Sequence, residues 1–242
     1  MSDSETNTTD QSTPGSNKNY GQSALVNAYT LGAFAIAAAL ILGSVYVGTK
    51  DRIEASRILA EQQALLQVIG DFPHDNDLIT DTLELTLEEQ EHLNSDAGSD
   101  IYVIRYQSKT TGFIFPTVAP DGYSGDISML VGVSISGDAL GVRVVEHKET
   151  PGLGDKVDEK KSDWILGFAG KSLVNPSVEN WAVTKDGGEF DAFTGATITP
   201  RAAVNRVKAV LEYFESAREA LLERAELTEL MRSENEVATN GQ

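Results

Sequence analysis

The sequence predicts an α+β domain carried on a single N-terminal transmembrane helix. Three observations lead to this prediction. A stretch near the N-terminus is apolar and uncharged over a length that can cross a bilayer. Four strand-like segments follow in the middle of the chain, and one long amphipathic segment closes it. Strands followed by a helix, rather than alternating with helices, are typical of the α+β class. We expect a mixed sheet with flanking helices.

The charge and the composition exclude several classes of protein. The chain has 242 residues, with 37 acidic and 19 basic side chains and a net charge of −18. Such a chain repels the phosphates of nucleic acids, so we expect no nucleic-acid partner. There is no cysteine. This excludes disulfides, attached c-type haem, cysteine-ligated iron–sulfur clusters and thiol nucleophiles. We predict no metal site and assign no catalytic residue.

The first element in the chain is the membrane anchor. No charged residue occurs between Asn19 and Thr49, and the apolar centre runs over residues 31–47. Tyr29 and Tyr46 bracket this centre. At ~1.5 Å per residue the two rings lie ~25 Å apart, which is typical of an aromatic belt. A cleaved signal peptide is the alternative. The long preceding segment and the lack of a clean small-x-small site argue against it.

The charges that flank the anchor leave its orientation open. The N-terminal side carries only Lys18, whereas the C-terminal side carries Lys50, Arg52 and Arg57. The positive-inside rule alone would place the large domain in the cytoplasm. Long domains cross membranes regardless of flanking charge, so this bias does not decide the topology.

The remaining elements follow in order. Residues 1–20 are polar and predict a disordered tail. Residues 51–69 predict an amphipathic helix continuous with the anchor, with Gly70 and Pro73 as its stop. The predicted strands are 101–106, 112–117, 128–135 and 140–147, with a hairpin turn at Gly137-Asp138. Short helices and glycine-rich loops are expected over 150–193, then a helix over 200–232 and a frayed polar end over 233–242.

The run Asp191-Ala-Phe-Thr-Gly-Ala-Thr-Ile-Thr-Pro200 predicts a loop that enters a helix. Thr199 is a suitable N-cap, and the proline after it suits the first helical turn. A phosphate on the Thr197 hydroxyl, just upstream, would meet unpaired backbone N–H groups and the positive end of the helix dipole. Gly195 and Ala196 have little bulk, so a large group can approach. On the residues alone, an ordinary capped helix start remains the alternative interpretation.

The same run carries a family resemblance. It matches the D-x-x-[ST]-G-A-T signature of covalently flavinylated FMN-binding domains. An anchor helix, the run Gly122-Tyr-Ser-Gly-Asp-Ile127 and the run His147-Lys-Glu-Thr-Pro-Gly-Leu-Gly154 agree with that family in order and spacing. The run 185–200 resembles the G subunits of Rnf/Rsx-type ion-translocating electron transport complexes. A more distant resemblance is to the C subunit of the sodium-translocating quinone reductase. The resemblance covers about residues 25–225.

The resemblance implies one FMN, joined to Thr197 by a phosphoester bond. It also implies that the flavin ring lies against the loop 149–154, where glycines allow close backbone approach and Leu153 packs on the ring. A Pro-Gly turn without a ligand is the alternative reading of this loop. The other expected cofactor contacts are Asp191, Thr194, Gly195, Ala196, Glu149, Thr150, Gly152 and Gly154. Trp164 and Trp181 are expected either in the core or stacked on the flavin.

The implied role is electron transfer within a membrane-bound ion-translocating complex. The resemblance implies other subunits of that complex and a flavin transferase as partners. It places the flavin domain on the periplasmic side of the bacterial inner membrane, and little turnover is expected from the chain alone. The predicted divisions are a disordered cytoplasmic tail at 1–24, a transmembrane helix at 25–49, a helical stalk and linker at 50–98, an FMN-binding domain at 99–225 and a polar C-terminal tail at 226–242.

Two other functions remain as alternatives. One is a membrane-anchored scaffold or binding module without a cofactor, which would use its acidic surface to hold a partner. The other is an FMN-binding sensor, which would need a signalling segment on the far side of the membrane. The N-terminal part is short and polar for such a segment.

Overall fold

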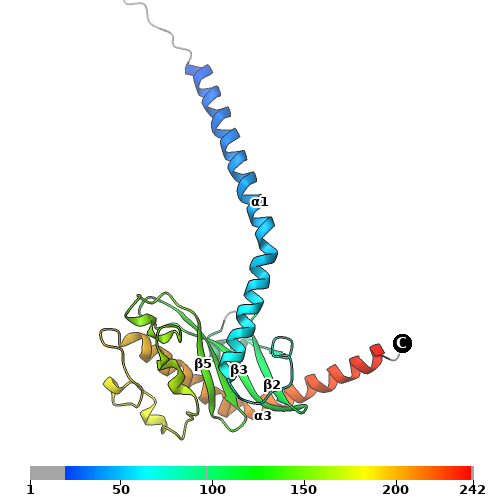
Figure 1. Cartoon of the computed structure of the whole chain (residues 1–242), viewed down its shortest axis with the longest axis vertical. Coiled ribbons are helices and arrows are strands. Elements are labelled where there is room, and N and C mark those ends of the chain that lie inside the picture. Colours follow the sequence, from blue (N-terminus) through cyan, green and yellow to red (C-terminus); the bar gives the residue numbers. More distant parts are fainter. Residues whose placement is uncertain (1–19, 96–97, 241–242) are drawn as a thin grey trace, which may run out of the picture. The chain divides into compact units, whose positions relative to one another are not determined.

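The computed structural model of the chain describes residues 20–95 and 98–240 (Figure 1). It divides into two compact units, residues 1–56 and 57–242. Most of the predicted tail at 1–24 lies outside the described residues.

Helix α1 (Tyr20–Ile69) is continuous from the anchor to the end of the predicted amphipathic segment. Its segment Asn27–Lys50 is long and apolar enough to cross a membrane, with a mean hydropathy of 2.1. Several large apolar side chains in this segment are at least 63% exposed: Tyr29, Leu31, Phe34, Ile36, Leu40, Ile41 and Leu42. The helix stops at Gly70, whose φ of 53° is left-handed and whose N–H donates to the carbonyl of Leu66.

The second unit is built on a five-stranded sheet in the order β1-β2-β3-β4-β5. The strands are β1 (Thr82–Glu84), β2 (Asp100–Tyr106), β3 (Lys109–Ala119), β4 (Ile127–Ser134) and β5 (Ala139–Glu146). The α+β class and the four longer strands are confirmed. The prediction of a mixed sheet is wrong, because every pairing between these strands is antiparallel. Connections as short as Gln107-Ser108 can join only antiparallel neighbours, since a parallel crossover needs a dozen residues or more.

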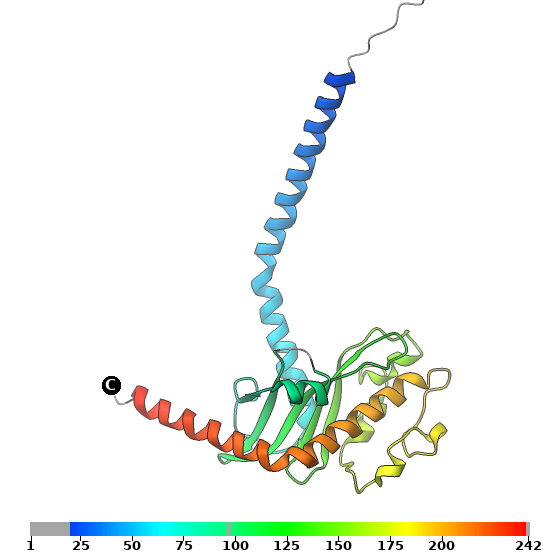
Figure 2. The ribbon, with the colours of Figure 1, turned by 180° about the vertical axis from the view of Figure 1, so that it is seen from behind.

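Alternate side chains of the sheet face two different helices. Phe113 and Phe115 belong to the core on the face covered by α3 (Ile198–Asn240), as seen from behind in Figure 2. Ile114, between them, belongs to a smaller core that includes Val68 near the end of α1. A period of two along β3 therefore supplies both cores. The end of α1 packs closely, because a Cβ on Gly141 would clash with the carbonyl oxygen of Val68.

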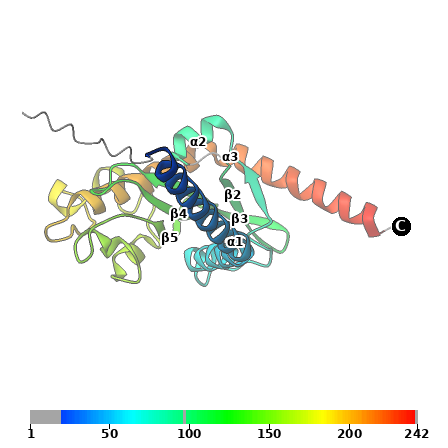
Figure 3. The same ribbon diagram turned by 90° about the horizontal axis from the view of Figure 1, so that it is seen from above.

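Helix α3 differs from the prediction at both ends. It begins at Ile198, two residues before the predicted start, and continues to Asn240, beyond the predicted end at Arg232. Its core side is as predicted, with Val204, Val207, Val210, Leu211, Phe214 and Leu221 buried and Leu222 partly buried. Residues 233–240, expected to fray, are helical. Seen from above, the start of α3 and the loops of residues 150–195 gather on the β5 side of the sheet (Figure 3).

A buried ion pair fastens the second half of α3 to the sheet. Arg105 on β2 and Asp81 are 2% and 1% exposed, and their charged groups meet at 2.8 Å. Arg105 also donates to the carbonyl of Ala225 at 2.8 Å, and Arg232 reaches Asp81 at 3.1 Å. Burial alone would raise the pKa of Asp81, but hydrogen bonds from Arg232 and Arg105 outweigh it and lower the pKa below its ordinary 3.8. The carboxylate is therefore ionised at neutral pH.

Two short elements were missed from the sequence. Strand β1 has three residues, too few for an alternation to show. Helix α2 (Leu87–Leu93) has a capping box in which Thr86 and Glu89 bond each other's backbone. That box is readable in the sequence as T-x-x-E. The short helices expected over 150–193 are four 3₁₀ turns: η1 (Gly154–Val157), η2 (Asp163–Phe168), η3 (Val178–Asn180) and η4 (Thr184–Asp186).

Candidate functional site

Two tight turns with glycine at the third position meet at the candidate site. In the first, Leu153 N–H donates to the carbonyl of Thr150 at 3.1 Å, and Gly152 has a φ of 78°. In the second, Ala196 N–H donates to the carbonyl of Phe193 at 3.1 Å, and Gly195 has a φ of 83°. A positive φ at this position is the requirement of a type II turn, which glycine meets without strain.

The two turns touch through Leu153 and Gly195. A Cβ built on Gly195 would lie 3.6 Å from a methyl group of Leu153, which is ordinary van der Waals distance. The loop 149–154 thus contains a Pro-Gly turn, which is compatible with both interpretations of this loop, and it also lies against the loop that precedes α3. Thr150, Gly152, Thr194 and Gly195 are exposed, so both turns present their tips to solvent.

The buried carboxylate of Glu149 holds three segments together. Its Oε2 accepts a hydrogen bond from the Thr199 hydroxyl at 2.7 Å, and its Oε1 accepts from the Ser124 N–H at 3.0 Å. Glu149 is 5% exposed and Thr199 is fully buried. A Cβ on Gly154 would clash with Oε2, and a Cβ on Gly122 would lie 2.9 Å from Oε1. Each run that carries the family resemblance therefore reaches this one side chain.

The start of α3 differs from the predicted cap. Arg201 N–H donates to the carbonyl of Thr197 at 3.2 Å, so Thr197 directly precedes the first helical residue. Thr199, predicted as the N-cap, lies within the first turn and donates its hydroxyl to a carboxylate. The cap prediction was wrong because it placed Pro200 at the first helical position, whereas proline is tolerated throughout the first turn. Thr197 still lies just upstream of the helix, as predicted.

The Thr197 hydroxyl is half-buried and has a cation beside it. Lys185 Nζ lies 2.6 Å from Thr197 Oγ1. The next residue, Asp186, makes a two-pronged ion pair with Arg201, at 2.6 and 2.9 Å. The hydrogen bond from Arg201 lowers the pKa of the Asp186 carboxyl, so this pair stays charged at neutral pH. The pair ties η4 to the first turn of α3.

The two tryptophans near the site pack against the core rather than standing open to a ligand. Trp181 is 2% exposed and lies among the aromatic rings of the core. Trp164 is half-buried, packs edge-on against Phe193 with ring centres 5.0 Å apart, and donates its indole N–H to the carbonyl of Asp191 at 2.9 Å. Asp191 itself is exposed. Trp164 thus supports the backbone of the signature loop.

The residues present fit a flavin phosphate and ring. A half-buried hydroxyl next to a lysine and at a helix N-terminus suits a phosphate ester. The two turns leave open space at Gly152, and three large apolar side chains on the same segments are solvent-exposed: Tyr123 at 67%, Leu153 at 43% and Ile198 at 44%. An apolar ring system can cover such side chains.

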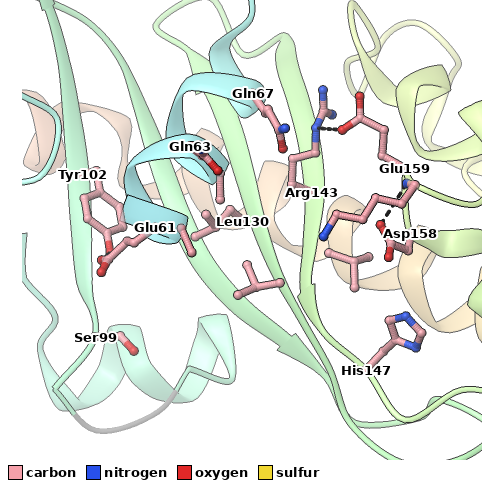
Figure 4. Close-up of a pocket in the computed structure, with 15 residues that line it drawn as sticks. Glu61, Gln63, Gln67, Ser99, Tyr102, Leu130, Arg143, His147, Asp158 and Glu159 are labelled. Carbon is pink, nitrogen blue, oxygen red and sulfur yellow. Dashed lines mark hydrogen bonds and ion pairs between the residues drawn. The ribbon is translucent and has the colours of Figure 1, made fainter. Parts of the chain in front are cut away.

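A separate pocket of about 590 Å³, lined by both polar and apolar side chains, lies beside the end of α1 (Figure 4). Glu61 points toward Tyr102 there, and Arg143 pairs with Glu159 at 2.8 Å. None of the signature residues 191–197 lines it. Its link to the site is His147, whose Nδ1 accepts the N–H of Glu149 at 3.1 Å.

Sequence reasoning missed Lys185 and the bonds made by Ser124 and Thr199. Lys185 stood at the start of the run used for the resemblance, but twelve residues separate it from Thr197 and nothing in the pattern pairs them. Ser124 lay within the quoted run 122–127, so that run did signal a contribution to the site.

Comparisons with known proteins match this arrangement. The family model of the FMN-binding domain matches residues 122–212, from the Gly122 loop into α3. The model of the RnfG N-terminal region matches residues 17–68, which cover most of α1.

Three relatives, each named as the G subunit of an ion-translocating oxidoreductase complex, are similar along most of the chain. The Shewanella loihica protein is 42% identical over 203 residues, covering 84% of this chain and 95% of its own length. The Pseudomonas aeruginosa protein is 44% identical, covering 83% and 93%. The Haemophilus influenzae protein is 45% identical, covering 74% and 84%. With such identity over nearly the full length of these relatives, the chain belongs to the family of G subunits of ion-translocating oxidoreductase complexes.

Proposed function

We propose that this chain is the electron-transfer subunit of a membrane-bound ion-translocating oxidoreductase complex, with one FMN joined to Thr197 by a phosphoester bond. Bound FMN supplies one- and two-electron redox chemistry. The chain supplies attachment, orientation and shielding. Its partners are the other subunits of the complex and a flavin transferase, and little turnover is expected from the chain alone.

The observation that carries the proposal is the contrast between the threonines of the signature loop. Thr197 is half-buried, with its hydroxyl next to Lys185 at the start of α3. Thr199 is fully buried, and its hydroxyl is committed to Glu149. A transferase can therefore reach Thr197 but not Thr199. Thr194 is exposed but lies at the tip of a turn, well short of the helix start.

The loops around Thr197 provide the proposed cofactor contacts. Leu153 and the backbone at Gly152 and Gly154 would lie against the ring, as would the turn at Thr194-Gly195-Ala196. Glu149 would contribute indirectly by holding these loops in place, since its carboxylate accepts hydrogen bonds from protein groups. Asp191 and Thr150 would contribute through the backbone, because their carbonyls accept the bonds that shape each loop.

The test is the mass of the denatured chain, purified from cells that also make the flavin transferase. We expect a gain equal to FMN minus water, located by peptide mapping on the peptide that contains Thr197. Thr197→Ala should lose this mass because the acceptor oxygen is gone. Thr80→Ala, at an exposed threonine outside the signature loop, is the matched control and should keep it.

Two results would count against the proposal. Covalent flavin that persists in Thr197→Ala would place the attachment elsewhere. A colourless, unmodified wild-type chain would favour the membrane-anchored scaffold without a cofactor.

The proposed location is the bacterial inner membrane, crossed once by Asn27–Lys50, with the flavin domain in the periplasm. The exposed apolar side chains of this segment support a helix that faces lipid. The periplasmic side follows from the family resemblance and runs against the weak charge bias at the helix ends. Protease accessibility in spheroplasts tests it.

A further inference from the structure

Lys185 is brought to Thr197 by the fold rather than by the sequence. Its Nζ lies 2.6 Å from Thr197 Oγ1, so the ammonium group donates a charge-assisted hydrogen bond to that oxygen. Lys185 lies in the 3₁₀ turn η4 and is solvent-exposed, whereas Thr197 directly precedes α3. An exposed lysine holds one position only when its backbone is fixed.

The backbone of η4 is fixed on both sides. Asp186 is clamped by Arg201 on the first turn of α3, at 2.6 and 2.9 Å. Thr184 N–H donates to the carbonyl of Phe190 at 2.7 Å, which closes the loop on its other side. Lys185 lies between these two attachments. The backbone therefore fixes the distance between the Lys185 Cα and Thr197. An extended lysine side chain is then enough to bring Nζ to the Thr197 hydroxyl.

The local charges single out Lys185. Arg201 is the other cation at the start of α3, but Asp186 neutralises it. Lys185 is then the source of net positive charge at the Thr197 hydroxyl. The chain as a whole carries −18 and repels an anionic flavin nucleotide. One cation at the acceptor oxygen reverses that repulsion where the phosphate must arrive.

Flavin attachment places new negative charge at this position. With FAD as the donor, the Thr197 oxygen forms a bond to the phosphorus next to riboflavin. The P–O–P bond breaks, AMP leaves, and the hydroxyl proton passes to a base of the transferase. The product is a phosphodiester with one negative charge. Its free oxygens lie two P–O bonds beyond the Thr197 oxygen that Lys185 already contacts.

We propose that Lys185 is a positioning residue for flavin attachment: it orients the Thr197 oxygen toward the donor pyrophosphate and afterwards pairs with the phosphodiester. This role rests on the proposed covalent FMN at Thr197. The 3₁₀ turn η4, which lies outside the signature loop, would thereby contribute to flavin attachment.

The experiment follows the rate of attachment by mass. Purified full-length chain in detergent micelles is incubated with flavin transferase and FAD, and the covalent product is measured over time. The variants are Lys185→Gln, Lys185→Arg and Lys109→Gln, the last at an exposed lysine on β3 used as a matched control. Thermal unfolding of each variant checks that the fold is unchanged.

Loss of a charge-assisted hydrogen bond at a solvent-exposed position should slow Lys185→Gln by roughly tenfold. Lys185→Arg keeps a cation and should stay within about twofold of wild type. Lys109→Gln should match wild type. Rescue by arginine separates a role of the charge from a role in folding.

Two failures are distinguishable. A wild-type chain that is never modified would overturn covalent FMN at Thr197, and the role of Lys185 with it. A Lys185→Gln variant that is modified as fast as wild type would overturn the role of Lys185 alone. An arginine variant as slow as the glutamine variant would also overturn it, because the positive charge would then be irrelevant.

Discussion

Thr199→Val tests whether the Glu149 carboxylate holds the candidate site together. The change keeps the shape of a fully buried side chain but removes the hydroxyl that donates to Glu149 at 2.7 Å. Glu149 would keep the bond from the Ser124 N–H at 3.0 Å, so the buried charge would not be left bare. The expected loss is that of one hydrogen bond to a charged group, about 2 kcal/mol of unfolding free energy.

Thermal unfolding of the full-length chain in micelles measures this loss. For a domain of this size, about 2 kcal/mol corresponds to a fall in Tm of roughly 4–8 °C. Thr184→Val is the matched control, because that threonine is exposed, and its Tm should stay within about 1 °C. A Thr199→Val variant as stable as the control would refute the reasoning. The hydrogen bond would then contribute nothing beyond what water supplies to the unfolded chain.

The remaining predictions concern acid stability and topology. The pKa of Asp81 is lowered in the folded chain, so the unfolded chain binds the proton more readily, and stability is lost as pH falls below its ordinary 3.8. Asp81→Asn should flatten that acid dependence and lower stability at pH 7, because Arg105 and Arg232 lose the buried carboxylate that they share. Urea unfolding at pH 2.5, 5 and 7 measures both effects, and an unchanged acid slope would contradict this account. For topology, protease added to intact spheroplasts should digest the flavin domain, and full protection until lysis would place that domain in the cytoplasm.

The strands and the two long helices could be predicted because local patterns specify them. The apolar run at the centre of β3 and the apolar stripe of α3 both appear in the sequence. The turn at Pro151-Gly152 was predictable for the same reason, since a Pro-Gly dipeptide favours a type II turn.

Sheet pairing and helix boundaries were harder to predict because they depend on contacts between distant residues. The start of α3 was misplaced because the hydroxyl of Thr199 bonds to Glu149, fifty residues earlier, instead of capping its own helix. The extension of α3 to Asn240 includes bonds between Arg232 and Asp81, which no local pattern reveals. Lys185 was missed for the same reason, because its contact with Thr197 joins residues that are twelve positions apart.

The hairpin of β4 and β5 has a consequence for where a partner can exchange electrons with the chain. Both outer ends of this hairpin, near Ile127 and Glu146, lead into the loops that Glu149 gathers, while its tip at Gly137 approaches Arg218 of α3. Eight residues of strand at ~3.3 Å each separate tip from loops by ~26 Å. The hairpin thus acts as a spacer. With the proposed FMN at Thr197, a redox partner docked at this tip would be too remote for contact with the flavin, so we expect electron exchange at the opposite end of the hairpin.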